Sequence, residues 1–562
     1  MTTHPFARAD TGRAHGRGLT ATSDIRAGEV IWRMEAPFVP HDEGEIRTWS
    51  AERQARFFRL SVQIGTTTHA GSLGDDLHDD PFVFTNHSCD PNTWWTKGML
   101  VAMRAICAGE EISFDYATSE IRPDFNIASC HCGAQRCRGA VGPHDLRDPE
   151  LRARYGDHLP RHVLETLGPR PWWSGSLQVG SDGLLFAGRS VRELARQTGT
   201  PVYLYDARRV SEQVATLRTV FSANRLSGRV YYALKANRFR PLLGRLLDEG
   251  DVGIDACSPR EVDWALETGF SADRVSVTAS ALTHRDLARL AAARVHVNLD
   301  NVSAIRRYSD LVPRGTAIGL RIDPEEVVGY GVNEKMAYAG GKLGLALETF
   351  EEARAVAESC GLVVDTVHMH LGWGLRESDS ARVEAAFARL ADVASRVATL
   401  GCVNVGGGLG ARLTTADRPL DPFVWGAILA RTIGGLGVPV ACEPGTFLVA
   451  DAGALVVEVA AAWTKRGVDW IAIDAGHAVN VYPAHYGLPL EIVPVARPLA
   501  PAETELHVAG NINESGDIFA RARPLPRLRE GELLALLPAG AYGASMASDH
   551  CLRGQPAELL IG

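Results

Sequence analysis

The chain reads Gly228-Arg229-Val230-Tyr231-Tyr232-Ala233-Leu234-Lys235-Ala236-Asn237 at the point that decides its fold. The β-branched and aromatic residues of this run predict a buried strand that ends at Lys235. Only five lysines occur among the 562 residues, so surface solubility does not explain this one. A lysine removed from water has a depressed pKa and forms an imine with an aldehyde, which is how enzymes hold pyridoxal phosphate. A strand-end lysine that reaches solvent is the alternative, and this stretch alone fits both.

Further motifs on both sides of this lysine decide between the two. They are, in chain order, Leu194–Tyr205, Asp255-Ala256-Cys257-Ser258, Lys342-Leu343-Gly344, His368-Met369-His370-Leu371-Gly372, Gly406-Gly407-Gly408-Leu409-Gly410, Glu443-Pro444-Gly445, Asp474-Ala475-Gly476, Glu514-Ser515-Gly516-Asp517 and Gly540-Ala541-Tyr542-Gly543. In this order the chain from about Gly175 onward resembles the fold-type III pyridoxal-phosphate decarboxylases, the diaminopimelate and ornithine decarboxylase family. A series of this length is far more specific than any one motif.

The resemblance implies a role for the polar residues of these motifs. Lys235 would bind the cofactor, and His370 would stack on its ring. Glu443 would pair with the pyridine nitrogen and keep it protonated, which makes the ring a stronger electron sink. Tyr542 would lie on the phosphate side. By itself each residue has a plainer explanation, since a lone histidine is often a satisfied core residue.

Two further groups of residues would complete the cofactor site. Gly406, Gly407 and Gly408 follow a short apolar run and would present backbone N–H groups to the phosphate. Asp255 and Ser258 would line the lysine side. Glycine-rich turns are common and an aspartate at a strand end is usually a cap, so these assignments depend on the resemblance.

In the family, the segment that corresponds to Glu514–Asp517 crosses the dimer interface and completes the partner's site. The resemblance therefore implies a homodimer with shared active sites. Glu514, Asp517 and Tyr486 would face the substrate, a small amino acid.

The departures from the family pattern concern the substrate. The family cysteine before Glu514 is associated with returning a proton to the carbanion, but here the position is Asn513, and an amide is not an acid. The two arginines that grip the remote carboxylate in diaminopimelate decarboxylases are Thr446 and Tyr482 here, which argues against diaminopimelate as the substrate. A serine expected after the His-x-Gly motif is Trp373. Either another residue donates the proton, with His477, His485 and His550 as candidates, or the carbanion has a different fate.

The N-terminal region carries a second constellation. Three cysteines are clustered as Cys130-x-Cys132-x4-Cys137, and Cys89 lies upstream in Asn86-His87-Ser88-Cys89. Four thiolates fit a closed tetrahedral zinc site, although three clustered cysteines also arise by chance. Together with Gly16-Arg17-Gly18-Leu19 and the closing run Gly109–Tyr116, residues 12 to 140 resemble a SET-domain lysine methyltransferase with its post-SET zinc loop. In that family the asparagine–histidine motif supplies the fourth zinc ligand.

The second resemblance also implies roles. Gly16 and Gly18 would let the backbone approach S-adenosylmethionine closely, and Asn86 and His87 would hold its polar parts. Tyr116 would line the methyl-transfer channel and orient a lysine amine for in-line attack. A zinc-stabilised docking module without catalysis is the alternative.

Length and composition limit the number of domains and the class of protein. A chain of 562 residues is expected to hold two or three domains. The net charge of −9 argues against a general nucleic-acid binder. The sequence holds neither a run of eighteen uncharged apolar residues nor a signal-peptide core, so we expect no membrane association and a cytoplasmic location. The ten cysteines are then expected to be thiols or metal ligands.

The expected fold is multidomain. Residues 1–145 would form a β-rich SET fold with its zinc loop, and residues 146–177 a helical linker. The alternation of apolar strands with amphipathic helices predicts an α/β (TIM-like) barrel over 206–450. Residues 178–205 and 451–562 would join in a β domain, the alanine racemase-like arrangement of fold type III.

Three hypotheses on function remain. The first is a bifunctional enzyme of specialised metabolism, in which pyridoxal-phosphate-dependent decarboxylation of a lysine- or ornithine-like amino acid, or of a carrier-bound derivative, is coupled to N-methyl transfer from S-adenosylmethionine. The second makes the SET half a binding or regulatory module on a decarboxylase. The third is an amino-acid racemase, against which the Glu514–Asp517 element argues. Methylation of a lysine on this chain or on a partner protein is also open.

Overall fold

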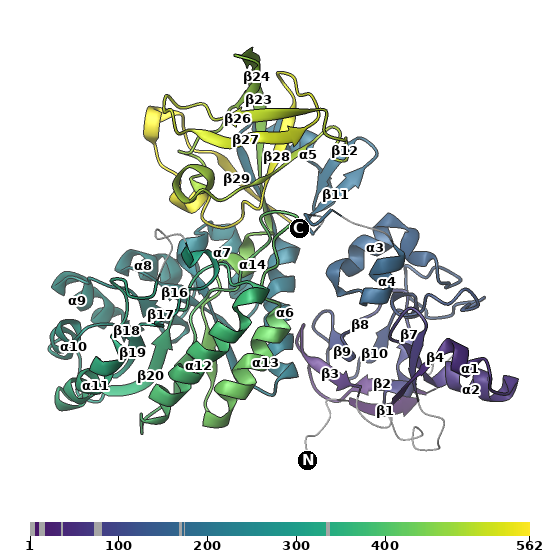
Figure 1. The fold of residues 1–562 in the computed structure, drawn as a ribbon. Helices are drawn as coiled ribbons and strands as arrows, with labels where there is room; N and C mark the ends of the chain where they lie inside the picture. Colours follow the sequence, from purple (N-terminus) through teal and green to yellow (C-terminus); the bar gives the residue numbers. More distant parts are fainter. Residues whose placement is uncertain are drawn as a thin grey trace. The chain divides into compact units, whose positions relative to one another are not determined.

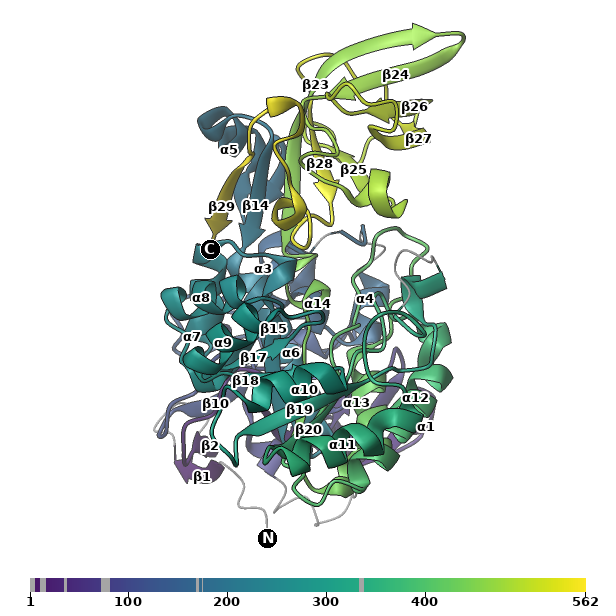
Figure 2. The same ribbon diagram turned by 90° about the vertical axis from the view of Figure 1, so that its left-hand side faces the viewer.

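The computed structural model describes residues 6–10, 17–34, 38–71, 81–167, 171–173, 175–332 and 338–562. The chain divides into two compact units, Met1–Pro171 and Trp172–Gly562 (Figures 1 and 2). Gly16 lies outside the described residues. Among those that are described, no helix is long and apolar enough to cross a membrane.

The first unit contains two β-sheets whose strands are mainly antiparallel. In spatial order the larger sheet contains β1 (Phe6–Asp10), β2 (Arg17–Ala21), β10 (Glu111–Phe114), β8 (Thr93–Thr96), β9 (Met99–Ala102) and β3 (Val30–Arg33), with β7 (Asn86–His87) beside β10. The smaller sheet contains β4 (Val39–Asp42), β6 (Thr68–Gly71) and β5 (Val62–Gln63), and the short helices α1 (Glu43–Ile46) and α2 (Ala51–Leu60) accompany it. Leu19, Trp95 and Ile112 are buried in the core of this unit. Because β7 pairs with β10 in parallel, the Asn86-His87 motif lies beside the strand that leads to Tyr116.

A helical segment completes the first unit. It consists of α3 (Pro149–Tyr155), the 3₁₀ turn η5 (Gly156–His158) and α4 (Arg161–Thr166). Leu151, Tyr155, Leu159 and Val163 are buried on one side of this segment, against Met103 and Ile121 of the sheet region. Residues 146 to about 167 therefore differ from the expected linker, because their apolar stripe is part of the core of the first unit.

The second unit contains a closed barrel of eight parallel strands. They are β15 (Gly228–Ala233), β16 (Val252–Ala256), β17 (Val275–Thr278), β18 (His296–Leu299), β19 (Ala317–Ile322), β20 (Val363–Met369), β21 (Cys402–Asn404) and β22 (Val440–Cys442), and β22 pairs with β15 to close the ring. The surrounding helices are α6 (Ala207–Ala223), α7 (Arg240–Asp248), α8 (Pro259–Thr268), α9 (His284–Ala293), α10 (Val302–Ser309), α11 (Phe350–Ser359), α12 (Ser380–Ser395) and α13 (Pro422–Thr432). Helices outside and side chains inside bury both faces of each strand, which is why these strands read as continuous apolar runs. The expected α/β barrel is confirmed.

A β domain is assembled from both sides of the barrel sequence. Its strands are β14 (Val202–Asp206), β23 (Gly453–Lys465), β24 (Val468–Ile473), β25 (Glu491–Pro494), β26 (Thr504–Ala509), β27 (Ile518–Leu525), β28 (Leu533–Leu537) and β29 (Ala557–Ile561). A small sheet of β11 (Leu177–Gly180), β12 (Gly183–Phe186) and β13 (Arg189–Ser190), with α5 (Val191–Thr198), adjoins it. β14 pairs with β23 and β29, so the segment before the barrel is tied to the end of the chain. Loops after β24 and β28 reach the barrel, where Tyr542 N donates to Ala236 O at 2.7 Å.

Candidate active site and metal centre

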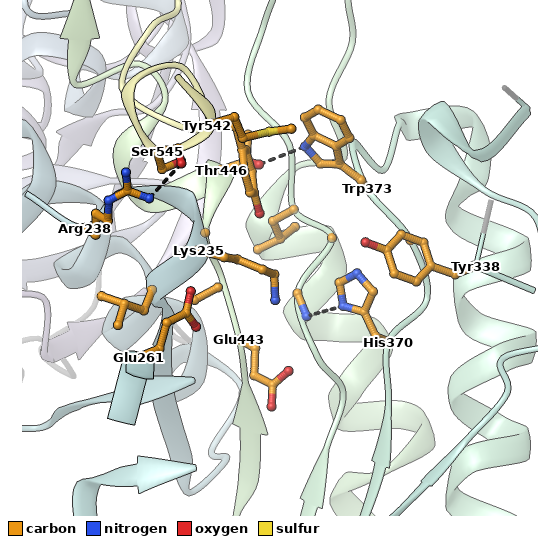
Figure 3. Close-up of a pocket in the computed structure, with 18 of the residues that line it drawn as sticks. Lys235, Arg238, Glu261, Tyr338, His370, Trp373, Glu443, Thr446, Tyr542 and Ser545 are labelled. Carbon is orange, nitrogen blue, oxygen red and sulfur yellow. Dashed lines mark hydrogen bonds between the residues drawn. The ribbon is translucent and has the colours of Figure 1, made fainter. Parts of the chain in front are cut away.

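The carboxyl ends of the barrel strands carry most of the predicted cofactor residues. Lys235 follows β15, Asp255 lies in β16, His370 follows β20 and Glu443 follows β22. In a closed parallel barrel all of these ends meet at one rim. Lys235, His370 and Glu443 line one cavity of about 370 Å³ there (Figure 3). Barrel closure thus brings together residues that are far apart in the sequence.

The ammonium group of Lys235 has two partners from the β16 segment. Its Nζ donates to Asp255 Oδ2 and to Cys257 Sγ, each at 3.3 Å, and 39% of the side chain stays open to the cavity. Burial lowers the pKa of Lys235, but the charges of Cys257 and Asp255 outweigh it and raise the pKa well above its usual value. The expected depressed pKa is therefore wrong for this structure, because an acid lies beside the amine.

Asp255 contacts the lysine as predicted, whereas Ser258 does not. Burial and the charge of Glu443 raise the pKa of Asp255. Its Oδ1 is one of the buried atoms, among the described residues, that have no hydrogen-bond partner. Ser258 Oγ instead accepts from Glu261 N at 3.2 Å and caps helix α8.

Glu443 is a buried carboxylate that three donors hold. Its Oε1 accepts from Asn404 Nδ2 at 2.7 Å and from Thr278 Oγ1 at 3.3 Å, and its Oε2 lies 3.0 Å from His368 Nε2. Burial would raise the pKa of Glu443, but His368 and the charge of Lys235 hold it at about 2. A carboxylate offers about four lone-pair sites, so three donors leave room for one more, such as a pyridinium N–H.

His370 is fixed by the glycine turn beside it. Its Nδ1 accepts from Gly407 N at 3.0 Å, so a proton on the neutral ring lies at Nε2. Burial lowers the pKa of His370 well below its usual value, with smaller contributions from the charges of Arg321 and Lys235. The ring of Tyr338 packs edge-on against it at 4.5 Å. A neutral imidazole in a fixed orientation is suited to contact with a flat ring.

The glycine turn is required by packing as well as by any anion. Gly406 has a φ of +65°, and a Cβ there would lie 2.5 Å from Met369 O; a Cβ on Gly407 would lie 2.5 Å from Glu443 O. Gly406 N donates to Asn404 Oδ1 at 2.9 Å, and Gly407 N to His370. Of the three predicted phosphate contacts, the first two N–H groups are thus engaged by side chains in this structure, and Gly408 lines the cavity.

Three departures from the family pattern lie in one place. Trp373 Nε1 donates to Thr446 Oγ1 at 2.8 Å, and both residues line the cavity (Figure 3). The buried ring of Tyr482 packs against Trp373 at 5.6 Å. Tyr486 and Tyr542 also line the cavity, with ring centroids 5.4 and 5.5 Å from Trp373. The positions where the resemblance implies a serine and two arginines therefore lie together, two of them (Trp373 and Tyr482) in an aromatic cluster and the third, Thr446, hydrogen-bonded to Trp373.

The predicted substrate residues Glu514 and Asp517 lie outside this cavity. Glu514 lines a second cavity of about 400 Å³ with His477 and His485, and Met546 lines both cavities. Glu514 Oε1 lies 3.2 Å from His550 Nε2. Asp517 is buried and accepts from the backbone of His477 at 2.7 Å and of Ile512 at 3.0 Å, so it holds this turn together. The predicted substrate contact of Asp517 is not formed within one chain.

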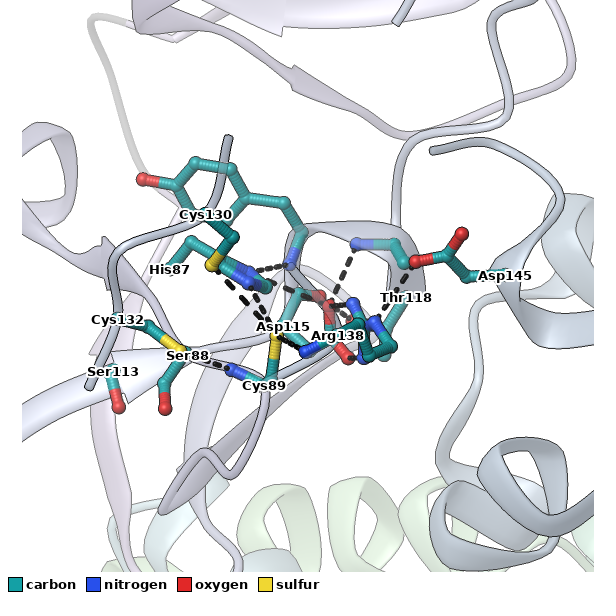
Figure 4. Close-up of polar contacts among 12 residues, drawn as sticks. His87, Ser88, Cys89, Ser113, Asp115, Thr118, Cys130, Cys132, Arg138 and Asp145 are labelled. Atoms are coloured by element: carbon teal, nitrogen blue, oxygen red, sulfur yellow. Dashed lines mark hydrogen bonds and ion pairs between the residues drawn. The ribbon is translucent and has the colours of Figure 1, made fainter. Parts of the chain in front are cut away.

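In the first unit, a compact cluster of sulfur and nitrogen atoms lies at the predicted zinc site (Figure 4). Ligand atoms of His87, Cys89, Cys130 and Cys132 all lie within 4.8 Å of one another. Cys89 Sγ is 3.9 Å from Cys130 Sγ and 3.3 Å from His87 Nε2. Two sulfurs on one tetrahedral zinc, each at about 2.3 Å, lie about 3.8 Å apart, so the donor set fits zinc. The structure places His87 in this group, whereas Cys137 Sγ donates to Cys130 O at 3.5 Å.

An ion pair ties the cysteine loop to the sheet. Arg138 donates to both carboxylate oxygens of Asp115 at 2.6 and 2.8 Å, and Tyr155 Oη donates to Asp115 at 2.7 Å. Arg138 N also donates to Cys89 Sγ at 3.4 Å. One buried carboxylate therefore joins the closing strand, the cysteine loop and the helical segment.

The structure brings some of the predicted S-adenosylmethionine residues together and turns another one away. Asn86 Nδ2 donates to Arg17 O at 3.1 Å, next to Gly18 in β2, and to Glu111 Oε1 at 2.9 Å. Tyr116 Oη donates to Thr85 O at 2.9 Å, and burial raises the pKa of Tyr116 to about 12. The side chain of His87 turns toward the cysteines, so its predicted contact with the methyl donor is not supported.

Several residues that shape the cavity around Lys235 were not identified from the sequence. His368, Asn404 and Thr278 are polar residues in the last two positions of mostly apolar strands, and this location near the carboxyl ends of the barrel strands was the available signal. Tyr338 lies in a loop and Met546 in the short 3₁₀ helix η14 (Ala544–Met546), and neither segment carries a comparable signal in its sequence.

A closed parallel barrel whose rim gathers a lysine, a buried carboxylate and a glycine turn, together with a β domain, defines a pyridoxal-phosphate-dependent enzyme of fold type III. Residues 207–450 match the family model "Pyridoxal-dependent decarboxylase, pyridoxal binding domain", and residues 16–117 match the SET domain. The chain belongs to the diaminopimelate and ornithine decarboxylase family and carries a SET domain ahead of it.

Individual relatives agree with this family. Diaminopimelate decarboxylase of Methanothermobacter thermautotrophicus is 34% identical over 400 residues, which cover 68% of this chain and 92% of the relative. The Streptomyces coelicolor diaminopimelate decarboxylase is 31% identical over 389 residues, covering 65% and 86%. The crystal structure of the Helicobacter pylori diaminopimelate decarboxylase complexed with L-lysine has a TM-score of 0.61 at 24% identity, covering 66% of this chain and 94% of that one. Vibrio vulnificus lysine/ornithine decarboxylase complexed with putrescine has a TM-score of 0.57 at 19% identity, covering 66% and 97%; these two likenesses show the shared fold.

Proposed function

We propose that the second unit decarboxylates a basic α-amino acid in the cavity around Lys235. The observation that carries the proposal is the convergence of Lys235, His370 and Glu443 on one cavity at the carboxyl-terminal rim. Lys235 would hold the aldehyde carbon of pyridoxal phosphate, Glu443 its ring nitrogen and His370 its ring face. The cofactor supplies an acceptor for the electron pair that the departing carbon dioxide leaves behind.

The residues of this chain would orient the substrate and control protons. Glu443 stays ionised at neutral pH and can hold a proton on a ring nitrogen. Gly408 and Tyr542 line the cavity and are the proposed phosphate contacts. Asn513 supplies no acid, so the proton that replaces the carboxylate must come from another group. His477, His485 and His550 lie in or beside the second cavity and are the candidates from this chain.

The substrate preference rests on the aromatic cluster. Thr446 and Tyr482 present no positive charge where the resemblance implies two arginines, so the proposed substrate has no second carboxylate. Lysine, ornithine or a carrier-bound derivative meets this condition. Diaminopimelate is the second candidate, because the relatives that cover most of this unit bear that name.

A homodimer is proposed because Glu514 lies outside the cavity of its own chain. In this arrangement the Glu514–Asp517 turn of one chain would complete the cavity of the other.

For the first unit we propose zinc binding and methyl transfer from S-adenosylmethionine to an amine. The donor set around Cys89 supports zinc. The adjacency of Asn86 to the Arg17 backbone and of His87 to Tyr116 supports a methyltransferase site. In the transfer, a C–N bond forms as the sulfonium C–S bond breaks, and the amine releases a proton. The second candidate is a non-catalytic docking module, and the contact of His87 Nε2 with Cys89 Sγ is the observation that supports it.

Release of carbon dioxide tests the main proposal. The full-length protein, with pyridoxal phosphate added, is given carboxyl-labelled L-lysine, L-ornithine and meso-diaminopimelate. We expect release from one of the first two, loss of release in Lys235→Ala, and full release in Lys465→Ala, which changes an exposed lysine of β23. Release only from diaminopimelate would replace the proposed substrate. An amino acid that loses its α-proton but not its carboxylate would point to a racemase.

A further inference from the structure

The cavity around Lys235 has one wall made of aromatic side chains. We define the aromatic wall as the cavity-lining residues Tyr338, Trp373 and Tyr486, which lie next to the proposed phosphate contact Tyr542. Trp373 is at its centre, and the ring of Tyr486 is inclined to it at 79°. On the phosphate side, the ring of Tyr542 is inclined to Trp373 at 62°. Rings set at steep angles around one position present several π faces and edges to a bound group.

Trp373, the central residue of the aromatic wall, is held in place by several contacts. Trp373 is anchored to Thr446 through its indole N–H, and its backbone oxygen accepts from Tyr330 N at 2.8 Å. The buried rings of Tyr330 and Tyr482 each pack 5.6 Å from Trp373. A rigid wall binds a ligand without the loss of side-chain freedom that a mobile one would suffer.

The charged groups that line the cavity are engaged elsewhere. The described lining cations are Lys235 and Arg238, and Arg238 donates to Ser545 O at 2.9 Å. The lining carboxylates are Glu443, which has three donors, and Glu261, whose oxygen accepts from Cys257 N at 2.6 Å. Figure 3 shows both carboxylates away from Trp373, with Lys235 between.

These observations limit which charged group the far end of the substrate can carry. A carboxylate would find no guanidinium among the described lining residues at the wall, apart from the engaged Arg238. A primary ammonium carries three N–H donors that need acceptors; the phenol oxygens of Tyr338 and Tyr486 can accept, whereas the ring faces around Trp373 are poor acceptors. A methylated ammonium keeps the charge, carries fewer or no N–H donors, and is attracted to aromatic faces within about 6 Å of a ring centroid.

We propose that the amino acid decarboxylated here carries an N-methylated, cationic group at its far end, and that the aromatic wall selects it. This inference rests on the decarboxylation proposed above. The reaction class that must supply such a substrate is N-methylation of a side-chain amine by a sulfonium donor, which is the class proposed for the first unit. The chain would then carry two consecutive steps, first methylation and then loss of carbon dioxide.

The test compares three amino acids on the full-length protein loaded with pyridoxal phosphate. They are L-lysine, Nε-trimethyl-L-lysine, and the neutral analogue with a tert-butyl carbon in place of the trimethylammonium nitrogen. We expect kcat/KM for trimethyl-lysine to exceed that of the neutral analogue by about tenfold or more, the range that desolvated cation–π contacts support. Trp373→Leu should remove most of this ratio, while both substrates share any loss due to general disturbance of the cavity.

A second readout does not depend on turnover. Calorimetric Kd values for the decarboxylation products, the trimethylammonium diamine and its tert-butyl counterpart, should show the same charge preference and the same loss in Trp373→Leu. Equal kcat/KM and Kd values for the charged and neutral compounds, or preference for unmethylated lysine, would overturn the methylated-substrate inference and leave decarboxylation standing. If none of these amino acids, nor L-ornithine, nor diaminopimelate releases carbon dioxide, the proposed function itself is wrong.

Discussion

Replacing Glu443 by glutamine removes one negative charge from the floor of the cavity while keeping the size of the side chain. In the native protein the two carboxylate oxygens accept from Asn404, Thr278 and His368. A glutamine can keep its oxygen toward Asn404 and Thr278, but its NH₂ group then meets the N–H of His368. The imidazole must move its proton to Nδ1, a buried atom with no partner among the described residues.

The size of the effect follows from this rearrangement. A buried donor left without a partner costs about 1–3 kcal/mol. For a unit of roughly 390 residues the entropy of unfolding is about 0.8 kcal/mol per degree, so Tm should fall by about 1–4 °C. The loss in activity should be much larger, about 10²–10³ in kcat, because the charge that keeps a ring nitrogen protonated is gone.

The assay measures carbon dioxide release and thermal unfolding on the same preparations. Glu443→Asp retains the charge and serves as the matched variant, with a smaller loss of activity expected. Because the pKa of Glu443 is about 2, ionisation of this residue should not limit the wild-type rate between pH 5 and 9. A glutamine variant with kcat within about threefold of the wild type would refute the proposed role of this carboxylate.

Three further predictions concern the first unit. Burial raises the pKa of Glu120 to about 7, so the stability that this residue contributes should be full below about pH 4 and lost as the pH rises through 7. Glu120→Gln should remove up to about 3 kcal/mol of this dependence of the unfolding free energy on pH. An unchanged slope of Tm against pH in the variant would contradict this prediction. Cys89→Ser should lower zinc content, measured by mass spectrometry of the metal, whereas Cys107→Ser at an exposed cysteine should not; equal metal content in both would exclude this centre. Tyr155→Phe removes the hydrogen bond to Asp115 and should destabilise the first unit by about 1–3 kcal/mol in denaturant unfolding, and no loss would mean that the helical segment packs without it.

The barrel could be predicted because its signals are local. The run that ends at Lys235 is long, apolar and β-favouring, and the alternation with amphipathic helices repeats along the chain. Motif order then placed Lys235, His370 and Glu443 at strand ends. Their assembly around one cavity follows from barrel closure alone.

What could not be predicted depends on contacts between distant segments. The acid beside Lys235 is set by the pairing of β15 with β16, and it reverses the expected direction of the lysine pKa. His87 joins the cysteines because the loop around Cys130 folds back onto β7. By contrast, Leu151, Tyr155, Leu159 and Val163 recur every four residues, so the docking of the supposed linker was visible in the sequence.

The most direct test of Lys235 as the lysine that binds the cofactor is to locate where pyridoxal phosphate attaches to the chain. The full-length protein is incubated with pyridoxal phosphate, reduced with borohydride and digested, and the masses of its peptides are measured by mass spectrometry. We expect a pyridoxyl mass on the peptide that contains Lys235, present in Lys465→Ala and absent from Lys235→Ala. A pyridoxyl group on a different lysine, or none on any peptide, would contradict it.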